Sequence, residues 1–286
     1  MRILNEKGKV METQKLILQR GGIYVTLKCT LRCKICISNV PFYEHPPHFS
    51  YKRITQSLER YFQIIDKVND FSFTGGEPFI HENLPELIDF TTLYFHKYDG
   101  FQIITNGTIL PSNRLIKSLK NNSKIRVLID YYGDNEGVLS AKAYEISDLL
   151  LSNEINNSVR VQYGETAYHD GWVDLTDLRL KNYTVNEARD LFGKCVFPQK
   201  YKFVFPIFDG IIYACEMSRI CIEKGLHPPH KAECLDLFDD SLSLENKRDW
   251  FRSIYKLKFL RTCHFCDGFT NDRKRYNYQE QLIKQT

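Results

Sequence analysis

The stretch IYVTLKCTLRCKIC, residues 23–36, determines the fold class of this chain. Its first five residues are apolar, aromatic or β-branched, which predicts a buried strand over residues 23–27. Three cysteines follow at once, Cys29, Cys33 and Cys36, so the strand would end in a loop that carries three thiols. Soft thiolates are ligands for iron–sulfur clusters and for zinc. With no fourth cysteine nearby, one iron of a four-iron cube would stay open, as in reactive metal sites.

A zinc loop is the alternative for these three thiols, with a remote fourth ligand such as His45 or His48. Two later motifs bear on the choice. Residues 71–74 form a β-rich run that leads into Gly75-Gly76-Glu77-Pro78, and residues 101–105 lead into Asn106-Gly107. Glycines at the end of a strand let a ligand approach the backbone, because no Cβ is in the way.

The wider pattern alternates strands with amphipathic helices. Strands are expected at residues 23–27, 70–73, 101–105, 125–130 and 158–163, and helices at residues 54–68, 84–95, 114–119 and 143–151. This alternation indicates parallel strands joined by crossover helices. In such folds ligands bind at the C-terminal edge of the strands, which is where the motifs above are expected.

The three-cysteine motif, followed by Gly-Gly-Glu-Pro and Thr-Asn-Gly, resembles the radical SAM superfamily over residues 22–172. The resemblance implies an α/β fold with a partial (β/α)6 TIM-like barrel. It also implies that Cys29, Cys33 and Cys36 ligate a [4Fe–4S] cluster, and that S-adenosylmethionine binds the open iron. One-electron reduction would then cleave the cofactor and give a 5′-deoxyadenosyl radical.

The same resemblance assigns further residues to the cofactor. Gly75, Gly76, Glu77 and Pro78 would hold the methionine amino group of S-adenosylmethionine, and Asn106 belongs to the second motif of this site. Asp130, at the end of a predicted strand, would contact the ribose. Ile35 stands where relatives carry an aromatic residue, so adenine would keep an apolar contact and lose stacking. From the residues alone, Asp130 is equally a turn former before Tyr131-Tyr132-Gly133.

A second set of cysteines lies towards the C-terminus: Cys195, Cys215, Cys263 and Cys266. Apolar runs at residues 203–208 and 211–215 flank Asp209-Gly210 and predict a β-hairpin, and a helix is expected at residues 244–257. Ligand type alone leaves a structural zinc and an iron–sulfur cluster equally open. The spacing resembles the Twitch domain, a shortened SPASM domain. That resemblance implies one auxiliary [4Fe–4S] cluster in a small β-hairpin and helix domain.

These predictions divide the chain into an N-terminal extension (1–21), the partial barrel (22–175), the auxiliary-cluster domain (176–270) and a C-terminal tail (271–286). Two cysteines remain, Cys221 and Cys234. They are interpreted either as small buried apolar residues or as donors of a hydrogen atom to a substrate radical. Residues 169–172 are expected to form either a solvated turn or a substrate contact. The basic tail Arg273-Lys274-Arg275-Tyr276 is expected to form a solvated end rather than a nucleic-acid arm.

Composition limits the partners. The net charge is +4, which does not favour nucleic acid, and no apolar run approaches the roughly 18 residues that a membrane span needs. An odd number of cysteines, nine, without an export signal predicts a cytoplasmic chain in a reducing compartment.

The predicted function is therefore that of a radical SAM oxidoreductase or epimerase that removes a hydrogen atom from a carbohydrate or aminocyclitol-like substrate. This rests on similarity to aminoglycoside-type dehydrogenases and epimerases of the family. A flavodoxin or ferredoxin would supply electrons. Modification of a ribosomally made peptide, by epimerisation or crosslinking, is the alternative among enzymes, although about 22 residues before the first strand are few for a leader-binding domain. A non-catalytic zinc-binding interaction module is the alternative of another class.

Overall fold

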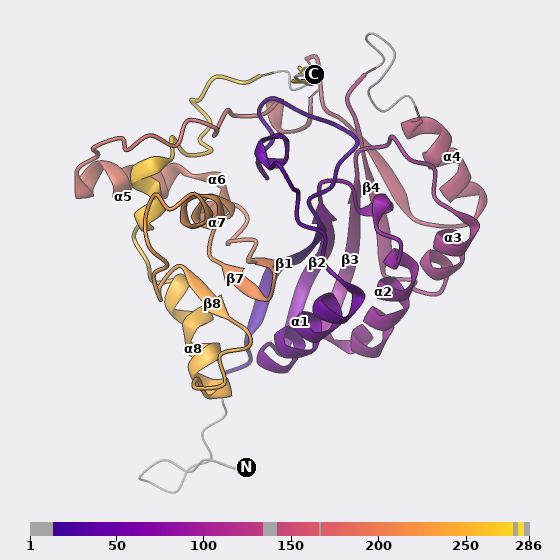
Figure 1. Ribbon diagram of the computed structural model, residues 1–286, viewed down its shortest axis with the longest axis horizontal. Coiled ribbons are helices and arrows are strands. Elements are labelled where there is room, and N and C mark those ends of the chain that lie inside the picture. The colour runs from indigo at the N-terminus through magenta and orange to yellow at the C-terminus, as the bar shows by residue number, and fades with distance from the viewer. Residues whose placement is uncertain (1–13, 134–141, 166, 277–279, 283–286) are drawn as a thin grey trace, which may run out of the picture.

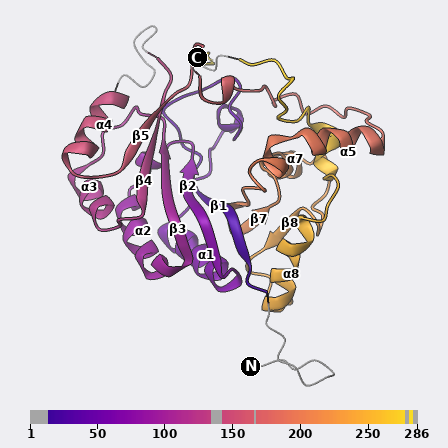
Figure 2. The same ribbon diagram turned by 180° about the vertical axis from the view of Figure 1, so that it is seen from behind.

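A computed structural model describes residues 14–133, 142–165, 167–276 and 280–282. One mixed sheet runs through it, with strand order β5-β4-β3-β2-β1-β6-β7-β8 (Figures 1 and 2). Neighbouring strands from β1 to β5 pair in parallel. The bounds of these five strands are Ile17–Thr26, Lys67–Gly75, Tyr98–Thr105, Ile125–Tyr131 and Asn157–Val161.

The sheet continues on the other side of β1 with the predicted hairpin. β6 (Pro206–Phe208) pairs in parallel with β1, and β7 (Ile211–Tyr213) returns antiparallel to β6. β8 (Cys234–Asp236) then pairs antiparallel with β7. The predicted fold class is confirmed: a parallel α/β sheet is followed by antiparallel C-terminal strands.

Four helices connect the parallel strands and pack along them (Figure 1): α1 (Tyr51–Ile64), α2 (Leu84–Thr91), α3 (Asn113–Lys120) and α4 (Ala143–Ser152). The first was predicted at residues 54–68, so both its start and its end were placed too late. The helix ends at Ile64 and the backbone is extended at Ile65, so Val68 lies buried in β2 instead. After Thr91 the chain tightens into a 3-10 helix, Thr92–Lys97. The core between sheet and helices is rich in aromatic rings, among them Tyr61, Phe62, Phe71 and Phe101.

The C-terminal part adds α5 (Val185–Lys194), α6 (Val196–Gln199), α7 (Glu216–Glu223) and α8 (Leu244–Ile254). Of these helices, α7 packs against β7 and α8 packs against α1. Short 3-10 turns lie at Val40–Phe42, Pro78–Ile80, Tyr168–Asp170 and Arg261–Phe265. The helix predicted at residues 244–257 is α8, three residues shorter at its C-terminal end. Among the described helices, none combines the length and apolar character needed to cross a bilayer.

Candidate active site

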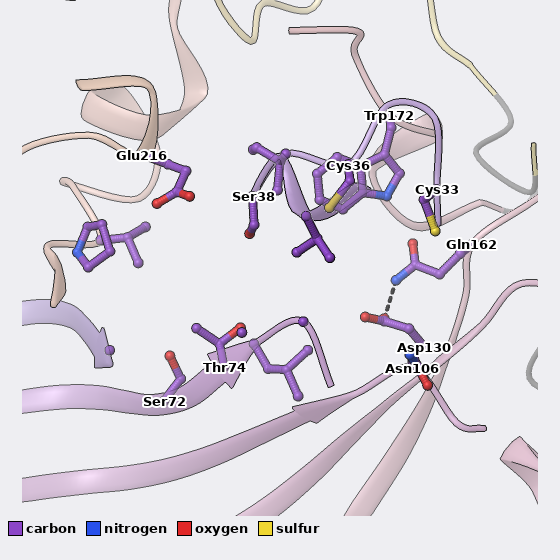
Figure 3. A pocket seen from close by; sticks show the side chains of 18 of the residues that line it. Cys33, Cys36, Ser38, Ser72, Thr74, Asn106, Asp130, Gln162, Trp172 and Glu216 are labelled. Atoms are coloured by element: carbon purple, nitrogen blue, oxygen red, sulfur yellow. Dashed lines mark hydrogen bonds between the residues drawn. The ribbon is translucent and has the colours of Figure 1, made fainter. Parts of the chain in front are cut away.

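A cavity of about 330 Å³ lies at the C-terminal ends of the parallel strands. Its wall combines the loop after β1, the ends of β2, β3 and β4, and residues from the C-terminal part (Figure 3). The strands bring together most of the residues predicted for the first cluster and its cofactor: Cys29, Cys33, Ile35, Cys36, Gly75, Gly76, Asn106 and Asp130. The residues predicted from the sequence to bind the cluster and its cofactor thus converge on one cavity.

The three thiols of the loop after β1 receive N–H donors. The backbone N–H of Leu31 and the side-chain amide of Asn106 each donate to Cys29 Sγ at 3.4 Å. Burial raises the pKa of Cys29 to about 11 and that of Cys33 to about 12. Burial without a cation disfavours thiolates. An iron–sulfur core would supply the missing positive charge, and the N–H donors would stabilise its ligand sulfurs.

His45 and His48, which were considered as a remote zinc ligand, have other surroundings. His48 Nδ1 and Nε2 form hydrogen bonds with Thr26 Oγ1 and Glu82 Oε2, both at 2.9 Å. The His45 side chain is 93 % exposed. The structure therefore gives the zinc-loop alternative no support from these two histidines, because His48 is engaged by Thr26 and Glu82 and His45 is exposed to solvent.

Gly75 and Gly76 are required by a close approach of two backbones. Gly76 N donates to Thr26 O, and Glu77 N donates to Lys28 O, both at 2.8 Å. A Cβ on Gly75 would lie 1.9 Å from Thr26 O, and one on Gly76 would lie 2.3 Å from Lys28 O. Only glycine lets the end of β2 pack against the start of the cysteine loop.

Glu77 and Pro78 do not line the cavity. The Glu77 carboxylate is fully buried and accepts hydrogen bonds from Phe79 N at 2.9 Å, Thr105 Oγ1 at 2.9 Å and Asn106 N at 2.7 Å. Burial raises its pKa to about 7, although the three donors act in the opposite direction. Glu77 thus braces the ends of β2 and β3 from behind the cavity.

Asp130 is the penultimate residue of β4, so the turn-former interpretation is wrong. Its carboxylate forms a two-point ion pair with Arg160, with both N–O distances 2.8 Å, and accepts a further hydrogen bond from the Gln162 amide (Figure 3). Burial raises the pKa of Asp130, and the charge of Arg160 opposes that shift. The pair presents a fixed polar edge to the cavity.

The C-terminal cysteines form a second group. Cys195, Cys215, Cys263 and Cys266 line a smaller cavity of about 30 Å³ among apolar side chains, and Cys215 also lines the large one. Leu260 N donates to Cys263 Sγ at 3.4 Å, and Gly268 N donates to Cys266 Sγ at 3.3 Å. Burial raises the pKa of Cys215, and the nearby Cys195 and Cys266 thiols raise it further.

Neither set of cysteines is arranged around a single metal ion among the described residues. In the part of the chain that the structure describes, no three His, Cys, Asp or Glu side chains are placed to hold one metal ion. Thiolates on a zinc ion all lie about 2.3 Å from it, whereas the ligands of a cube bind separate iron atoms and stand farther apart.

Cys221 and Cys234 lie outside the cavity. Cys221 is completely buried in α7, and Cys234 Sγ donates to His230 O at 3.5 Å at the start of β8. The fold therefore does not bring either thiol to the place where the predicted hydrogen-atom transfer would occur. By contrast, the predicted loop at residues 169–172 contributes His169, Gly171 and Trp172 to the wall, which favours the substrate-contact interpretation over a solvated turn.

Sequence reasoning missed Glu216, the residue after Cys215. Its carboxyl group lies on the side of the cavity across from Asp130 (Figure 3). The fully buried Arg219 holds its Oε1 through Nε at 3.0 Å and Nη2 at 2.5 Å. The available signal was the Glu-x-x-Arg spacing on one helix face, but that spacing is common on surfaces as well.

Comparisons with known proteins agree with this geometry. A family model described as the radical SAM superfamily matches residues 23–142. The 7,8-dihydro-6-hydroxymethylpterin dimethyltransferase of Methanocaldococcus jannaschii is 30% identical over 119 residues, 41% of this chain and 22% of that protein. A GTP 3′,8-cyclase of Campylobacter jejuni is 28% identical over 174 residues, 59% of this chain and 49% of that protein. The chain thus spans between about a fifth and a half of the length of these curated relatives.

Solved structures share the fold over most of the chain. BtrN, in complex with AdoMet and 2-DOIA, superposes with a TM-score of 0.58 and 15% identity, and the match covers 94% of this chain and 99% of BtrN. The anSMEcpe protein with bound AdoMet and Cp18Cys peptide gives a TM-score of 0.53 and 14% identity, covering 92% and 93%. At these identities the likeness shows the fold and nothing more.

Proposed function

The chain is a member of the radical SAM superfamily, and from this premise we propose that it is an enzyme that cleaves S-adenosylmethionine reductively and removes a hydrogen atom from a substrate C–H bond. The observation that carries this proposal is the cavity where the three thiols of Cys29, Cys33 and Cys36 face Gly75 and Asp130. When bound there, a [4Fe–4S] cluster with S-adenosylmethionine supplies the 5′-deoxyadenosyl radical.

The residues of this chain would bind and orient that cofactor. Gly75 and Gly76 line the cavity and would offer backbone atoms to the methionine amino group. Asp130, fixed by Arg160, offers a carboxylate to a ribose hydroxyl, and the buried Ile35 gives adenine an apolar contact. Asn106 orients Cys29 through its amide. The largely apolar wall would limit the access of water to a reactive species.

The substrate we propose is a carbohydrate or aminocyclitol-like molecule, which the enzyme oxidises or epimerises. A cavity of about 330 Å³ is near the lower limit for drug-sized ligands, so a small substrate fits beside the cofactor better than a large one. Polar groups on its wall that suit hydroxyl or amino groups are Arg20, His169 and Glu216, while Trp172 offers an aromatic face. BtrN, which shares the fold, has the small molecule 2-DOIA in its own structure.

The second group of cysteines would hold an auxiliary [4Fe–4S] cluster with four protein ligands. Cys215 supports this role, because it lines both cavities, so a cluster bound there would lie beside the substrate. A fully ligated cluster cannot bind substrate without losing a ligand, so its roles are electron transfer and structural support. A flavodoxin or ferredoxin would deliver the electron that starts the reaction.

Metal analysis after anaerobic reconstitution tests the proposal. Each cube contains four iron and four sulfide, so two cubes predict about eight of each per chain. Reduction in the presence of S-adenosylmethionine should then release 5′-deoxyadenosine. Cys36→Ala should abolish this release, whereas Cys234→Ala, a cysteine outside the cavity, should retain it. Two zinc ions without sulfide would contradict the proposal and support a zinc-binding module.

A substrate screen then separates the reaction types. The reconstituted enzyme is incubated in deuterated water with sugars and aminocyclitols, and 5′-deoxyadenosine is compared with the substrate-free background. Epimerisation returns a hydrogen to the substrate, so solvent deuterium enters the product if an exchangeable group donates it, whereas oxidation to a ketone adds none. Stimulation by peptides alone would contradict the small-molecule assignment and favour peptide modification.

A further inference from the structure

The C-terminal tail is paired with the loop that carries the first three cysteines. Gln281 forms an antiparallel bridge with Cys33. On either side of this bridge, Lys34 N donates to Glu280 O at 3.0 Å, and Leu282 N donates to Arg32 O at 2.8 Å. An ion pair between Lys34 Nζ and Glu280 Oε1 at 2.7 Å adds to the pairing. Residues 280–282 of the tail thus pair antiparallel with residues 32–34 of the cysteine loop.

The side chain of Gln281 makes two directed contacts within this pairing. Its Oε1 accepts a hydrogen bond from Arg32 N at 2.6 Å, and its Nε2 donates to Cys33 Sγ at 3.2 Å. A backbone N–H requires an acceptor, so the amide oxygen faces Arg32 and the NH2 group faces the sulfur. The orientation of the amide is therefore fixed by chemistry as well as by geometry.

The same tail also reaches another part of the cavity wall. Tyr276 N donates to Trp172 O at 2.8 Å, and Trp172 N donates to Tyr276 O at 3.2 Å. Cys33 and Trp172 both line the cavity. The expectation that the residues around 273–276 form a solvated end is corrected at Tyr276, whose backbone pairs with the wall of the site.

We propose that Gln281 is a positioning residue of the first cluster, and that its N–H···S bond to Cys33 raises the reduction potential of that cluster. The proposal rests on the proposed function. Reduction adds an electron whose charge is shared with the ligand sulfurs, so an N–H donor stabilises the reduced form more than the oxidised form. Residues that form hydrogen bonds with the ligands of a metal tune its properties, although they do not bind the metal themselves.

The test compares reduction potentials of the reconstituted full chain. Potentiometric titration followed by electron paramagnetic resonance gives the potential of the first cluster, which is distinguished from the auxiliary cluster by the change of its signal on adding S-adenosylmethionine. Gln281→Met removes donor and acceptor, and Gln281→Glu keeps the acceptor for Arg32 but places a negative oxygen at Cys33. We expect the potential to fall in the order wild type, Gln281→Met, Gln281→Glu.

Glu280→Gln is the matched control, since it breaks the ion pair with Lys34 and leaves the amide of Gln281 in place. Its potential should not fall. Potentials for both Gln281 variants equal to that of the wild type would overturn the proposal, as would an equal fall in Glu280→Gln. A wild-type chain that assembles no cluster would instead contradict the proposed function.

A second measurement needs no cluster. In the metal-free chain, iodoacetamide alkylation of Cys33 is followed by mass spectrometry of its peptide, with Cys36 as the internal reference. Because Gln281 donates a hydrogen bond to the Cys33 sulfur, Gln281→Met should change the rate at which Cys33 is alkylated relative to Cys36, whereas Glu280→Gln should match the wild type. Unchanged alkylation in Gln281→Met would show that the contact does not form.

Discussion

Glu77 is a carboxylic acid buried without a cationic partner among the described residues that contact it. Three N–H or O–H donors surround it, yet loss of water dominates and raises its pKa from 4.5 to about 7. A raised pKa means that the folded protein binds the proton more tightly than the unfolded chain. The contribution of Glu77 to stability is therefore greatest at low pH and declines as the pH rises from 4.5 to 7.

Glu77→Gln should remove this decline. As the pH rises through this range, the free energy of unfolding of the wild type should fall relative to that of the variant by about 3 kcal/mol. Urea unfolding at several pH values measures the difference. Glu59→Gln, an exposed carboxylate on α1, is the control and should follow the wild type. Parallel pH profiles for Glu77→Gln and the wild type would show that Glu77 does not titrate in this range.

Gly75 and Gly100 lie in the neighbouring strands β2 and β3, and a Cβ added to each would contact different kinds of atom. On Gly75 it would meet the backbone carbonyl of Thr26 at 1.9 Å, and on Gly100 the side-chain Oδ1 of Asp70 at 2.6 Å. A side chain can rotate away, whereas β1 cannot move without disturbing the cysteine loop. Gly75→Ala should therefore cost about 3 kcal/mol and Gly100→Ala clearly less, as measured by urea unfolding. Equal costs would contradict the close-approach argument.

At the scale of elements, α7 is held by a buried arginine. Arg219 reaches three groups besides Glu216: Glu223 Oε2 at 2.6 Å, Tyr43 Oη at 2.7 Å and Ser38 O at 3.0 Å. Its guanidinium also lies 4.6 Å from the centre of the Phe208 ring. Such a dense set of contacts offsets the desolvation of a buried charge only while all partners are present.

Arg219→Met should destabilise the protein by about 3–5 kcal/mol, because it leaves the Glu216 carboxylate buried without its ion pair. Arg252→Met is the matched control on α8, where the arginine pairs with Glu245 and Asp249 near solvent, and should cost about 0–1 kcal/mol. Adding Glu216→Gln to Arg219→Met should recover part of the loss. Thermal or urea unfolding measures all three, and no recovery in the double variant would contradict the pairing.

Elements with regular patterns and clear ends were predictable, and those stabilised by distant contacts were not. β2, β3, β4 and the helices between them were expected near their observed positions. β1 was expected to start at residue 23 rather than Ile17, because Gly21 and Gly22 interrupt its apolar pattern. The unpredicted α5 has a sequence signal, a capping box between Thr184 and Glu187, but few apolar residues.

The residues of the candidate site also fall into those that the local sequence predicts and those that depend on distant contacts. The cysteines and the glycine motif were predictable because each follows a strand, and parallel strands place their ends together. Gln281 was not, because it contacts Cys33 across 248 residues of sequence. Glu216 was not, because only the burial of Arg219 distinguishes it from an ordinary helix-surface glutamate.

At the scale of the whole molecule, one sheet crosses the boundary predicted between residues 175 and 176. β6 pairs with β1, and Arg248 of α8 reaches Asp66 Oδ2 at 2.5 Å and Ile64 O at 2.6 Å, just before β2. The two parts that the sequence analysis separated therefore share hydrogen bonds and core. We expect them to unfold together.

The two tryptophans of the chain allow this to be measured. Trp172 lies at the cavity and Trp250 in α8, so Trp250→Phe leaves a probe for one part and Trp172→Phe for the other. Urea unfolding of the two variants, each followed by fluorescence and by circular dichroism, should give one midpoint per variant by both methods. Fluorescence and circular dichroism midpoints that differ within a variant would indicate two independent folding units.

Arg219 also has a consequence for how the protein matures. One of its nitrogens holds the carbonyl of Ser38, two residues beyond Cys36, while its helix begins directly after Cys215. Arg219 thus connects the loop of the first cysteine set to the helix that follows Cys215, so ordering of one set restricts the conformations of the other. With both cysteine sets holding clusters as proposed, incorporation of the first cluster should speed incorporation of the second, and oxygen damage to either should destabilise the other.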